Sequence, residues 1–328
     1  MQSLSNDQIH AYKAAVPSVM EREPMAKHTS FRIGGPARLY VIASSSEALI
    51  QAVQAAEEAN VPWYVFGGGS NLLVADEGFE GVMIQAANRG LEIREGRILL
   101  ESGVVTIFAA RKIVEAGFEG FEWASGVPGT IGGAIYGDAG CFGGEMRDAV
   151  VSVDAYRLRD KTRLTLSKED CRFGYRESLF KHEPHIILGC VLQLKKAADP
   201  AVTRLKFEEV MKMRVQKQPL DQSSCGCIFK NYEFKEESEL TVLRRQIKEI
   251  PEGMLKNHVL AAGWLIDQVG MRGMAIGNIA ISEKHGNFLV NKGQARAQDV
   301  VQLISLVKMK VRDELGIELQ EEAQFVGF

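Results

Sequence analysis

The first part of the chain alternates between segments with the apolar spacing of strands and segments with that of helices. Residues 38–44 have strand character, and residues 44–60 follow with apolar side chains three and four positions apart, as in a helix. Ser44 and Glu47 have the separation of a capping box, so we expect the helix to begin at Ser44. Its apolar stripe is Leu49, Ala52, Val53 and Ala56.

The same alternation continues through the next fifty residues. A short apolar strand ends in the sequence GGGSN at 67–71, and further strands are predicted at 81–87 and 97–103. Residues 105–117 then return to helical spacing. The side chains predicted to share one face of that helix are Ile107, Ala110 and Val114.

The C-terminal two thirds of the chain repeat both patterns. Strands are predicted at 150–158 and 185–194, and residues 200–219 form a helix that closes this region. Residues 297–316 form another helix, with Val300, Ile304, Val307, Val311 and Leu315 at helical spacing, and residues 317–328 alternate as a strand. The pattern predicts an α+β chain in which two segments join to hold a ligand and a third covers it.

Composition and charge exclude several classes of protein. The chain has 328 residues, 46% of them hydrophobic and 25% charged, with a net charge of −3. That balance does not favour binding to nucleic acid or to an anionic membrane, and no apolar run is long enough to cross a bilayer. The first sixteen residues have neither a basic start nor an apolar core, so we expect a cytoplasmic protein.

The five cysteines raise a separate question, because Cys225 and Cys227 flank a single glycine. An odd number of cysteines scattered over a long chain does not favour a disulfide framework. A structural zinc site would need a second pair of ligands at a matching spacing, so we predict no metal. A strained redox pair and two small buried residues near a tight turn both remain as interpretations, and the second is favoured.

Two glycine-rich segments indicate a ligand. The GGGSN turn follows a buried strand, and residues 121–146 contain eight glycines interleaved with apolar side chains, which is not the composition of a linker. Such backbone can approach a ligand closely and present its N–H groups to phosphate oxygens. Neither the Rossmann spacing of glycines nor a Walker lysine is present. The pair predicts a large phosphorylated cofactor without choosing among nucleotides.

Eight segments, in order along the chain, carry a resemblance to a known family. They are HTSFRIGGPA, FGGGSNLLV, SGVPGTIGGAIYGDAG, CRFGYRESLFK, CGCIFKN, AAGWLIDQVGMRG, NFLVNKG and GIELQEEAQFVG. The chain resembles the UDP-N-acetylenolpyruvoylglucosamine reductase (MurB) family of peptidoglycan-precursor enzymes. This resemblance implies an FAD-binding unit of the vanillyl-alcohol-oxidase (PCMH) type, in two parts at residues 1–85 and 86–212. It also implies a C-terminal α/β substrate-binding domain at residues 213–328.

The resemblance implies which residues hold the cofactor, a non-covalently bound FAD that NADPH reduces. The residues expected at the FAD diphosphate are Gly67, Gly68, Gly69, Ser70 and Asn71. The residues expected around the isoalloxazine and ribityl groups are Ser125, Pro128, Gly129, Ile131, Gly132 and Gly133. NADPH would deliver a hydride and leave, and the enolpyruvyl sugar would then receive that hydride at its vinyl carbon.

Three residues match the catalytic positions of the family. Arg176 matches the arginine that pairs with the substrate carboxylate, and a guanidinium suits an oxygen pair that becomes more electron-rich. Glu322 matches the glutamate that works beside it. Cys227 stands where most relatives have the serine that gives a proton to the substrate carbon. Because a free thiol has a pKa of about 8.5 and is protonated at neutral pH, we expect Cys227 to be the general acid and Cys225 to have no chemical role.

Further residues are expected to contact the substrate. Lys217 is the candidate for its diphosphate, and Asn231 and His285 are expected to line the same site. Without the resemblance, these three would be a solvated lysine, a turn asparagine and a loop histidine. Tyr232 is a further candidate contact.

The chain also departs from the family pattern. Asp138 stands where many relatives have asparagine, so an amide donor is replaced by an acceptor, and Phe142 stands where tyrosine is common. The segment 195–213 is short and lacks tyrosine, whereas the segment 231–259 is long. These features belong to different branches of the family and leave open how the substrate pocket closes.

Two other functions are weighed against the reductase. One is another flavin-dependent oxidase or dehydrogenase on the same scaffold, which the C-terminal segments disfavour. The other is a non-catalytic flavin-binding protein whose Cys-Gly-Cys sequence senses redox state. We expect the protein to be a monomer or weak oligomer.

Overall fold

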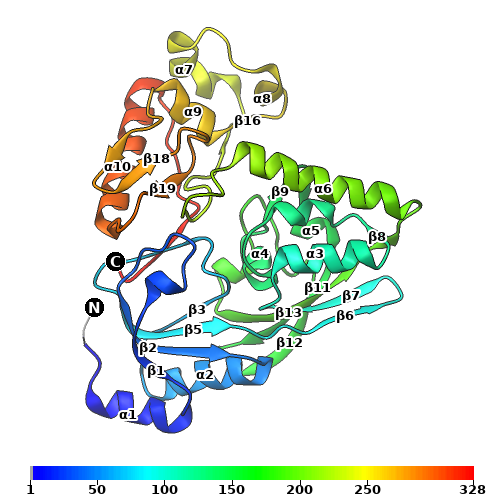
Figure 1. The fold of residues 1–328 in the computed structure, drawn as a ribbon, viewed down its shortest axis with the longest axis vertical. Helices are drawn as coiled ribbons and strands as arrows, with labels where there is room; N and C mark the ends of the chain where they lie inside the picture. The colour runs from blue at the N-terminus through cyan, green and yellow to red at the C-terminus, as the bar shows by residue number, and fades with distance from the viewer. Residues whose placement is uncertain (1–2) are drawn as a thin grey trace. The chain divides into compact units, whose positions relative to one another are not determined.

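The fold is described from a computed structural model that covers residues 3–328 (Figure 1). The chain separates into two compact units, each built from three pieces of sequence. Unit 1 comprises the N-terminal residues up to Glu23, together with Ala37–Gly69 and Phe79–Gln216. Unit 2 comprises Pro24–Pro36, Ser70–Gly78 and Lys217–Phe328. The chain therefore passes several times between the two units, and each is described by itself.

The first sheet of unit 1 contains the strands predicted at 38–44 and 81–87. Its strands, in spatial order, are β1 (Met20–Pro24), β2 (Pro36–Ala43), β5 (Phe79–Ala86) and β3 (Trp63–Phe66). β5 runs parallel to both of its neighbours, β2 and β3. Parallel strands need a crossover, and α2 (Ser46–Glu58) provides it. Apolar residues of α1 (Asn6–Ala15) and α2 form one core with this sheet.

The predicted cap of α2 was wrong by one residue. Ser45, not Ser44, is the N-cap, and its hydroxyl oxygen accepts a hydrogen bond from the Ala48 backbone N–H at 3.1 Å. Three consecutive serines made the choice ambiguous, because each has the side chain that a cap requires. The stripe of Leu49, Ala52, Val53 and Ala56 is buried, as predicted.

The second sheet of unit 1 is antiparallel throughout. Its strands, in spatial order, are β12 (Thr162–Ser167), β11 (Val150–Arg157), β13 (His185–Gln193), β7 (Arg97–Glu101) and β6 (Leu91–Arg94). The strands predicted at 97–103, 150–158 and 185–194 are thereby confirmed. One face of this sheet packs with α3 (Thr106–Glu115), α4 (Ile131–Tyr136) and α5 (Met146–Ala149) around a core that includes Phe121 and Val153.

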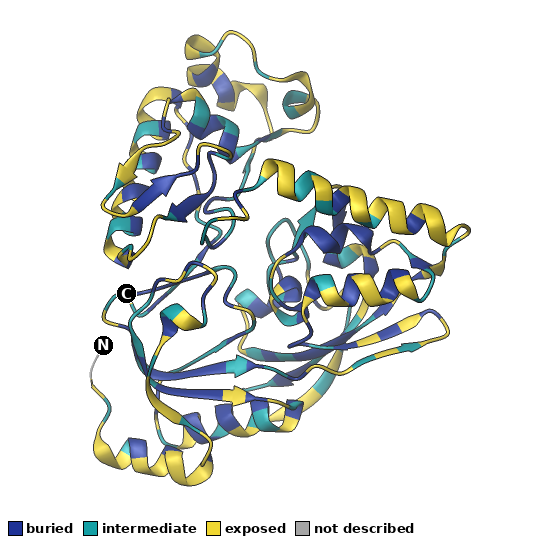
Figure 2. Ribbon diagram, viewed as in Figure 1, coloured by how far each residue is buried: buried dark blue, intermediate teal, exposed yellow. Residues whose placement is uncertain are grey.

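α6 (Pro200–Lys217) completes unit 1 and confirms the helix predicted at 200–219. Only Thr203 and Val210 are buried along its eighteen residues. Figure 2 shows α6 mostly as exposed, in contrast to the buried central strands β5 and β13. The smaller elements of unit 1 are β8 (Phe118–Glu119), η2 (Glu122–Gly126), β9 (Gly140–Cys141), β10 (Gly144–Glu145), η3 (Leu179–Lys181) and β14 (Lys195–Lys196), whereas η1 (Met25–Lys27) belongs to unit 2.

Unit 2 is organised around α10 (Ala297–Leu315), the helix predicted at 297–316. All five of its predicted apolar positions are buried, and Gly316 ends it in the left-handed conformation that glycine adopts without strain. α10 packs with an antiparallel sheet of β17 (Ala275–Ile276), β18 (Ile279–Ile281) and β19 (Leu289–Asn291). The other elements of unit 2 are β15 (Tyr232–Glu233), η4 (Glu237–Leu240), α7 (Thr241–Gln246), α8 (Glu252–Lys256), β16 (Val259–Leu260) and α9 (Ala262–Gln268).

The strand predicted at 317–328 is much shorter than expected. Only β20 (Gln324–Val326) is extended in a sheet, where it pairs in parallel with β4 (Leu72–Val74). Residues 317–320 do alternate between buried and exposed, but they follow α10 as irregular chain. Alternation indicates one buried face, and it does not by itself supply a partner strand.

The structure also bears on membrane and metal binding. Between residues 3 and 328, no helix is long and apolar enough to cross a membrane. The same residues contain no cluster of three or more His, Cys, Asp or Glu side chains suited to a metal ion.

Asn88 is the polar group that joins the two sheets of unit 1. Its fully buried side chain accepts hydrogen bonds from the Ser102 hydroxyl and the Gly103 N–H, both at 3.0 Å, and donates one to the Leu188 carbonyl at 2.9 Å. A second donated bond reaches the hydroxyl of Ser46, at the start of α2. Four groups from three separate parts of the chain therefore depend on one amide.

We expect Asn88→Ala to lower the free energy of unfolding by about 2–4 kcal/mol, because it leaves several buried polar groups without partners. Chemical denaturation followed by circular dichroism measures the change. Asn6→Ala, at an exposed helix position of the same unit, is the matched control and should change stability by less than about 0.5 kcal/mol. Equal effects of the two substitutions would contradict this role of Asn88.

Candidate functional site

The two glycine-rich segments singled out in the sequence lie against each other in unit 1. β3 ends at Phe66, and the turn that follows approaches the loop before α4 so closely that side chains are excluded. A Cβ atom on Gly67 would lie 2.1 Å from the Thr130 hydroxyl oxygen, and one on Gly68 would lie 3.1 Å from the Gly129 Cα. Gly69 has φ 62°, in the left-handed region that favours glycine. Close contact thus explains why this turn is built from glycine.

Thr130 provides a polar group that the protein itself does not use. Its side-chain oxygen is buried beside Gly67 and has no hydrogen-bond partner among the residues that the structure describes. A buried hydroxyl without a partner costs free energy, so its position calls for a ligand or a water molecule. Thr130 therefore adds a hydrogen-bonding group to the surface formed by the two glycine-rich segments.

The remaining residues expected around the flavin follow along the same loop and α4. Gly132 lies against Ser102, where a Cβ atom would come within 2.8 Å of the serine Cβ, and Gly133 is exposed. Ile131 is fully buried, whereas Pro128 is exposed. Ser125 is buried, and its hydroxyl donates to the Phe207 carbonyl of α6 at 3.5 Å.

These features fit a dinucleotide such as FAD. The glycine backbone has no side chains, and the short helix α4 and the unpartnered Thr130 hydroxyl follow it in the site. Such groups can receive phosphate oxygens without a cluster of positive charge. Gly67, Gly68 and Gly69, which are expected at the diphosphate, lie beside Gly129 and Thr130, and together these residues could hold such a group.

Unit 2 gathers the end of the GGGSN turn with two of the predicted catalytic residues. The Asn71 amide donates to the Glu322 carbonyl at 3.1 Å, although 251 positions separate the two in sequence. Glu322 in turn donates its N–H to the Ile228 carbonyl at 2.7 Å, next to Cys227. A Cβ atom on Gly226 would lie 3.9 Å from the Ser70 carbonyl oxygen. Ser70, Asn71, Cys227 and Glu322 therefore belong to one small region.

The backbone around Cys227 is held from two sides. Cys227 pairs with Phe288 and Phe229 pairs with Glu321, each as an isolated antiparallel bridge. The buried Asn287 side chain accepts from the Phe229 N–H at 2.9 Å and donates to the Phe229 carbonyl at 2.8 Å. A segment without regular secondary structure is thus kept in one conformation.

The two cysteines that flank Gly226 have different environments. Cys225 is buried in the core of unit 2, and burial raises its pKa to about 12, with the charges of Cys227 and Glu322 acting in the same direction. Cys227 is half-buried. All five cysteines are free thiols. Of the two, only Cys227 has the access that chemistry requires.

Two of the predicted substrate contacts lie close to the start of α9. The Asn231 amide oxygen accepts from the Ala262 N–H at 3.1 Å, and a Cβ atom on Gly263 would lie 3.2 Å from the His285 ring. Burial lowers the pKa of His285, and its Nδ1 accepts from the Asn287 N–H at 3.2 Å. A neutral ring consequently carries its proton on Nε2. Lys217, at the end of α6, is exposed.

Arg176 belongs to unit 1 and is held by backbone oxygens. Its guanidinium donates to the Gly140 carbonyl at 3.0 Å and to the Asp138 carbonyl at 3.4 Å. Arg176 itself has φ 55°, a conformation that non-glycine residues rarely adopt. The Lys181 ammonium donates to the Arg176 carbonyl at 2.6 Å, which stabilises that turn. The arginine is thus oriented in a half-buried position by its neighbours.

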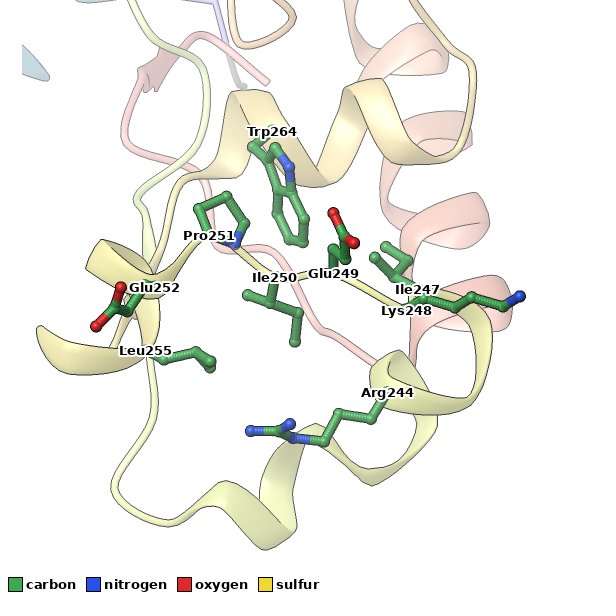
Figure 3. A pocket seen from close by; sticks show the side chains of 9 residues that line it. All are labelled: Arg244, Ile247, Lys248, Glu249, Ile250, Pro251, Glu252, Leu255 and Trp264. Carbon is green, nitrogen blue, oxygen red and sulfur yellow. The ribbon is translucent and has the colours of Figure 1, made fainter.

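The hollow shown in Figure 3 is a different feature of unit 2. It has a volume of about 610 Å³ and is lined by residues of α7, α8 and α9 and the chain between them, including Arg244, Ile250 and Trp264. None of the predicted site residues lines it. It therefore carries no part of the site described above.

Comparison with known proteins identifies the class and then the family. Residues 37–166 match a family described as "FAD binding domain", and residues 218–326 match "UDP-N-acetylenolpyruvoylglucosamine reductase, C-terminal domain". The protein is an α+β flavoprotein with an FAD-binding domain, followed by the C-terminal domain of this reductase family. The chain belongs to the UDP-N-acetylenolpyruvoylglucosamine reductase (MurB) family.

The similarity extends over nearly the whole chain. The UDP-N-acetylenolpyruvoylglucosamine reductase of Clostridioides difficile is 35% identical over 307 residues, which is 93% of this chain and 92% of that protein. The one from Heliobacterium modesticaldum is 36% identical over 94% of this chain and 90% of its own length. The crystal structure of UDP-N-acetylenolpyruvylglucosamine reductase (MurB) from Thermus caldophilus superposes with a TM-score of 0.72 at 30% identity, covering 94% of this chain and 98% of that one.

Sequence reasoning missed Thr130 and Asn287. Thr130 lies between two predicted cofactor residues, and only the tertiary structure leaves its hydroxyl buried without a hydrogen-bond partner among the described residues. The signal for Asn287 was present, since it opens the NFLVNKG segment, but nothing in the sequence connects it to Phe229.

We expect Thr130→Val to weaken FAD binding roughly tenfold, the cost of about one hydrogen bond to a charged group. The stability of the FAD-free protein should stay the same or rise slightly, because the lost hydroxyl has no partner in the described protein. Titration of flavin fluorescence and thermal unfolding measure the two effects.

Thr203→Val is the matched control, because the Thr203 hydroxyl donates to the Asp199 carbonyl at the start of α6. It should lower stability by about 1 kcal/mol and leave FAD affinity unchanged. Unaltered FAD affinity in Thr130→Val would show that this hydroxyl does not contact the cofactor.

Proposed function

We propose that the protein is a UDP-N-acetylmuramate dehydrogenase, which reduces UDP-N-acetylglucosamine enolpyruvate to UDP-N-acetylmuramate in the synthesis of peptidoglycan precursors. The relatives named UDP-N-acetylenolpyruvoylglucosamine reductase support this function. When bound, FAD supplies the hydride that it has taken from NADPH. The partner of the protein is therefore a small UDP-sugar.

The observation that carries the proposal is the environment of Cys227. Its segment is fixed by hydrogen bonds to Asn287 on one side and to the Glu322 region on the other, and yet the residue remains half-buried. A general acid needs a fixed position and access to its substrate. A thiol that served only packing would be enclosed, as Cys225 is.

The residues of the chain would divide the reaction between them. Hydride adds to the vinyl carbon, and the electron pair of the double bond moves to the carbon that bears the carboxylate. The Arg176 guanidinium stabilises the carboxylate as negative charge builds on it, and Glu322 takes the role of the family's C-terminal glutamate in the same step. Cys227 then gives its S–H proton to that carbon and is left as a thiolate, which takes a proton from solvent.

The substrate contacts and the domain division also stay with this proposal. Asn231 and His285 would contact the sugar or a phosphate, and Lys217 the diphosphate. Residues 1–85 and 86–212 would form the two FAD-binding parts, residues 213–328 would bind substrate, and the protein would act as a monomer or weak oligomer.

The redox-sensor alternative has less support. A sensing pair needs a thiolate that can attack, and burial raises the pKa of Cys225 to about 12, which keeps that thiol protonated at physiological pH.

We expect Cys227→Ala to block the second half-reaction and to spare the first. Anaerobic stopped flow should show bleaching of the yellow flavin by NADPH within about threefold of the wild-type rate. Recovery of colour on adding the enolpyruvyl substrate should slow by about 10²–10⁴-fold, the usual contribution of a general acid.

Cys225→Ala is the control, because it removes a neighbouring thiol that is buried. It should cost about 1–2 kcal/mol of stability and leave both half-reactions intact. If colour recovers at the wild-type rate in Cys227→Ala, Cys227 is not the proton donor.

We further expect the second half-reaction to slow at alkaline pH in the wild type, as the thiol ionises and loses the proton that it must donate. Cys227→Ser should move this limb to higher pH, because an alcohol does not ionise in the same range. Rate constants for flavin reoxidation, measured across pH in both proteins, test the expectation. An identical alkaline limb in the two proteins would assign it to another group.

A further inference from the structure

Asp138 is a buried carboxylate at a backbone position that the described mechanism does not use. It follows α4, with φ 40° in the left-handed region, and its side chain is 0% exposed. Its N–H donates to the Ile135 carbonyl at 3.2 Å, and the next N–H, of Ala139, donates to the Ala134 carbonyl at 2.8 Å. The end of the helix thus fixes the turn in which Asp138 lies.

The carboxylate of Asp138 is held by a single neighbouring residue. One oxygen accepts from the Arg147 backbone N–H at 2.9 Å, and the other lies 3.4 Å from the Arg147 guanidinium. Arg147 also pairs with Glu145, at the start of α5. A buried carboxylate with one cation shared between two acids is only partly compensated.

The backbone of the same turn holds Arg176. The carbonyls of Asp138 and Gly140 accept both of the guanidinium bonds described above, and the Ser178 hydroxyl ties the Arg176 turn to the Tyr136 carbonyl of α4 at 2.7 Å. Any change in the 138–140 turn is therefore passed to the guanidinium. The carboxylate of Asp138 also acts on Arg176 through its charge.

Asp138 changes between its neutral and its charged form near pH 6. Burial raises its pKa to about 6, opposed by the Arg147 N–H and charge and by Arg176, and assisted by the charge of Glu145. These are the charged groups that act on it from α5, from β10 and from the Arg176 turn. Asp138 is thus neutral below about pH 6 and charged above it.

We propose that Asp138, paired with Arg147, is a positioning residue for Arg176, and that its charge sets how strongly Arg176 binds the carboxylate of a ligand. The turn orients the guanidinium, and the ionised Asp138 side chain competes electrostatically with an incoming carboxylate. The inference rests on the proposed role of Arg176.

The test is the affinity of the FAD-loaded protein for UDP-N-acetylmuramate, a ligand with a carboxylate, measured from the flavin absorbance change between pH 5 and pH 8. In the wild type, Kd should rise about fivefold as Asp138 ionises near pH 6. In Asp138→Asn the new side chain tolerates the left-handed backbone and cannot ionise. The stepwise rise in Kd near pH 6 should therefore disappear. Arg147→Gln removes a charge that lowers the pKa of Asp138, so the step should move to higher pH.

Thermal unfolding provides a readout that does not involve the ligand. Because the folded pKa of Asp138 lies above its ordinary value of 3.8, its stabilising contribution is complete below about pH 4 and is lost as pH rises through about 6. The wild-type melting temperature should therefore fall more between pH 4 and pH 7 than that of Asp138→Asn.

The matched control for the affinity measurement is Asp160→Asn, at an exposed site in the same unit, which should keep the wild-type rise in Kd near pH 6.

The outcomes separate this inference from the function on which it rests. Arg176→Gln should weaken ligand binding at least tenfold. If it does not, the proposed role of Arg176 is wrong. If Arg176→Gln weakens binding while Asp138→Asn keeps the pH step, the role of Asp138 alone is overturned. Loss of the step in Asp138→Asn, together with its shift in Arg147→Gln, supports the inference, since a purely structural residue would change affinity equally at every pH.

Discussion

Two stretches of bare backbone in contact are the constraint on which the cofactor site depends. Gly67 lies so close to Thr130 that a Cβ atom would come within 2.1 Å of the threonine hydroxyl oxygen, and Gly68 packs tightly against Gly129. A larger residue at Gly67 would therefore push the two segments apart. This contact joins the end of a parallel sheet to the start of α4. The glycines are needed because of close packing, and a backbone without side chains can also approach phosphate oxygens closely.

Unit 2 achieves a comparable rigidity by hydrogen bonding. The segment around Cys227 belongs to no long strand, but Asn287 pairs with both backbone groups of Phe229, and Ile228 accepts from Glu322. A proton donor must be placed within a fraction of an ångström, and a loop without such bonds would not hold it there. Hydrogen bonds to a buried side-chain amide thus fix the position of an irregular segment, as the hydrogen bonds of a sheet fix a strand.

Charge is used sparingly in both units. The one arginine expected at the substrate is oriented by carbonyl oxygens. Carbonyl groups orient a guanidinium without neutralising it, so its charge stays available for a ligand. The charge of one buried acid nearby, Asp138, changes with pH and so alters how strongly the guanidinium attracts a ligand. Surroundings of low dielectric constant screen this interaction only weakly.

The sequence by itself determined the longer helices, most of the longer strands and the family, but not the strand expected at 317–328. The five apolar positions of α10 and the stripe of α2 are set by local periodicity, and all are buried as expected. It could not determine the tertiary arrangement. Residues 70–78 belong to unit 2, although the segments before and after them in sequence belong to unit 1. Asn71 likewise forms a hydrogen bond with Glu322, 251 positions away. Periodicity reports only which face of an element is buried. Which distant partner covers that face, and whether a hydroxyl such as Thr130 is left without one, is decided by packing of the whole chain.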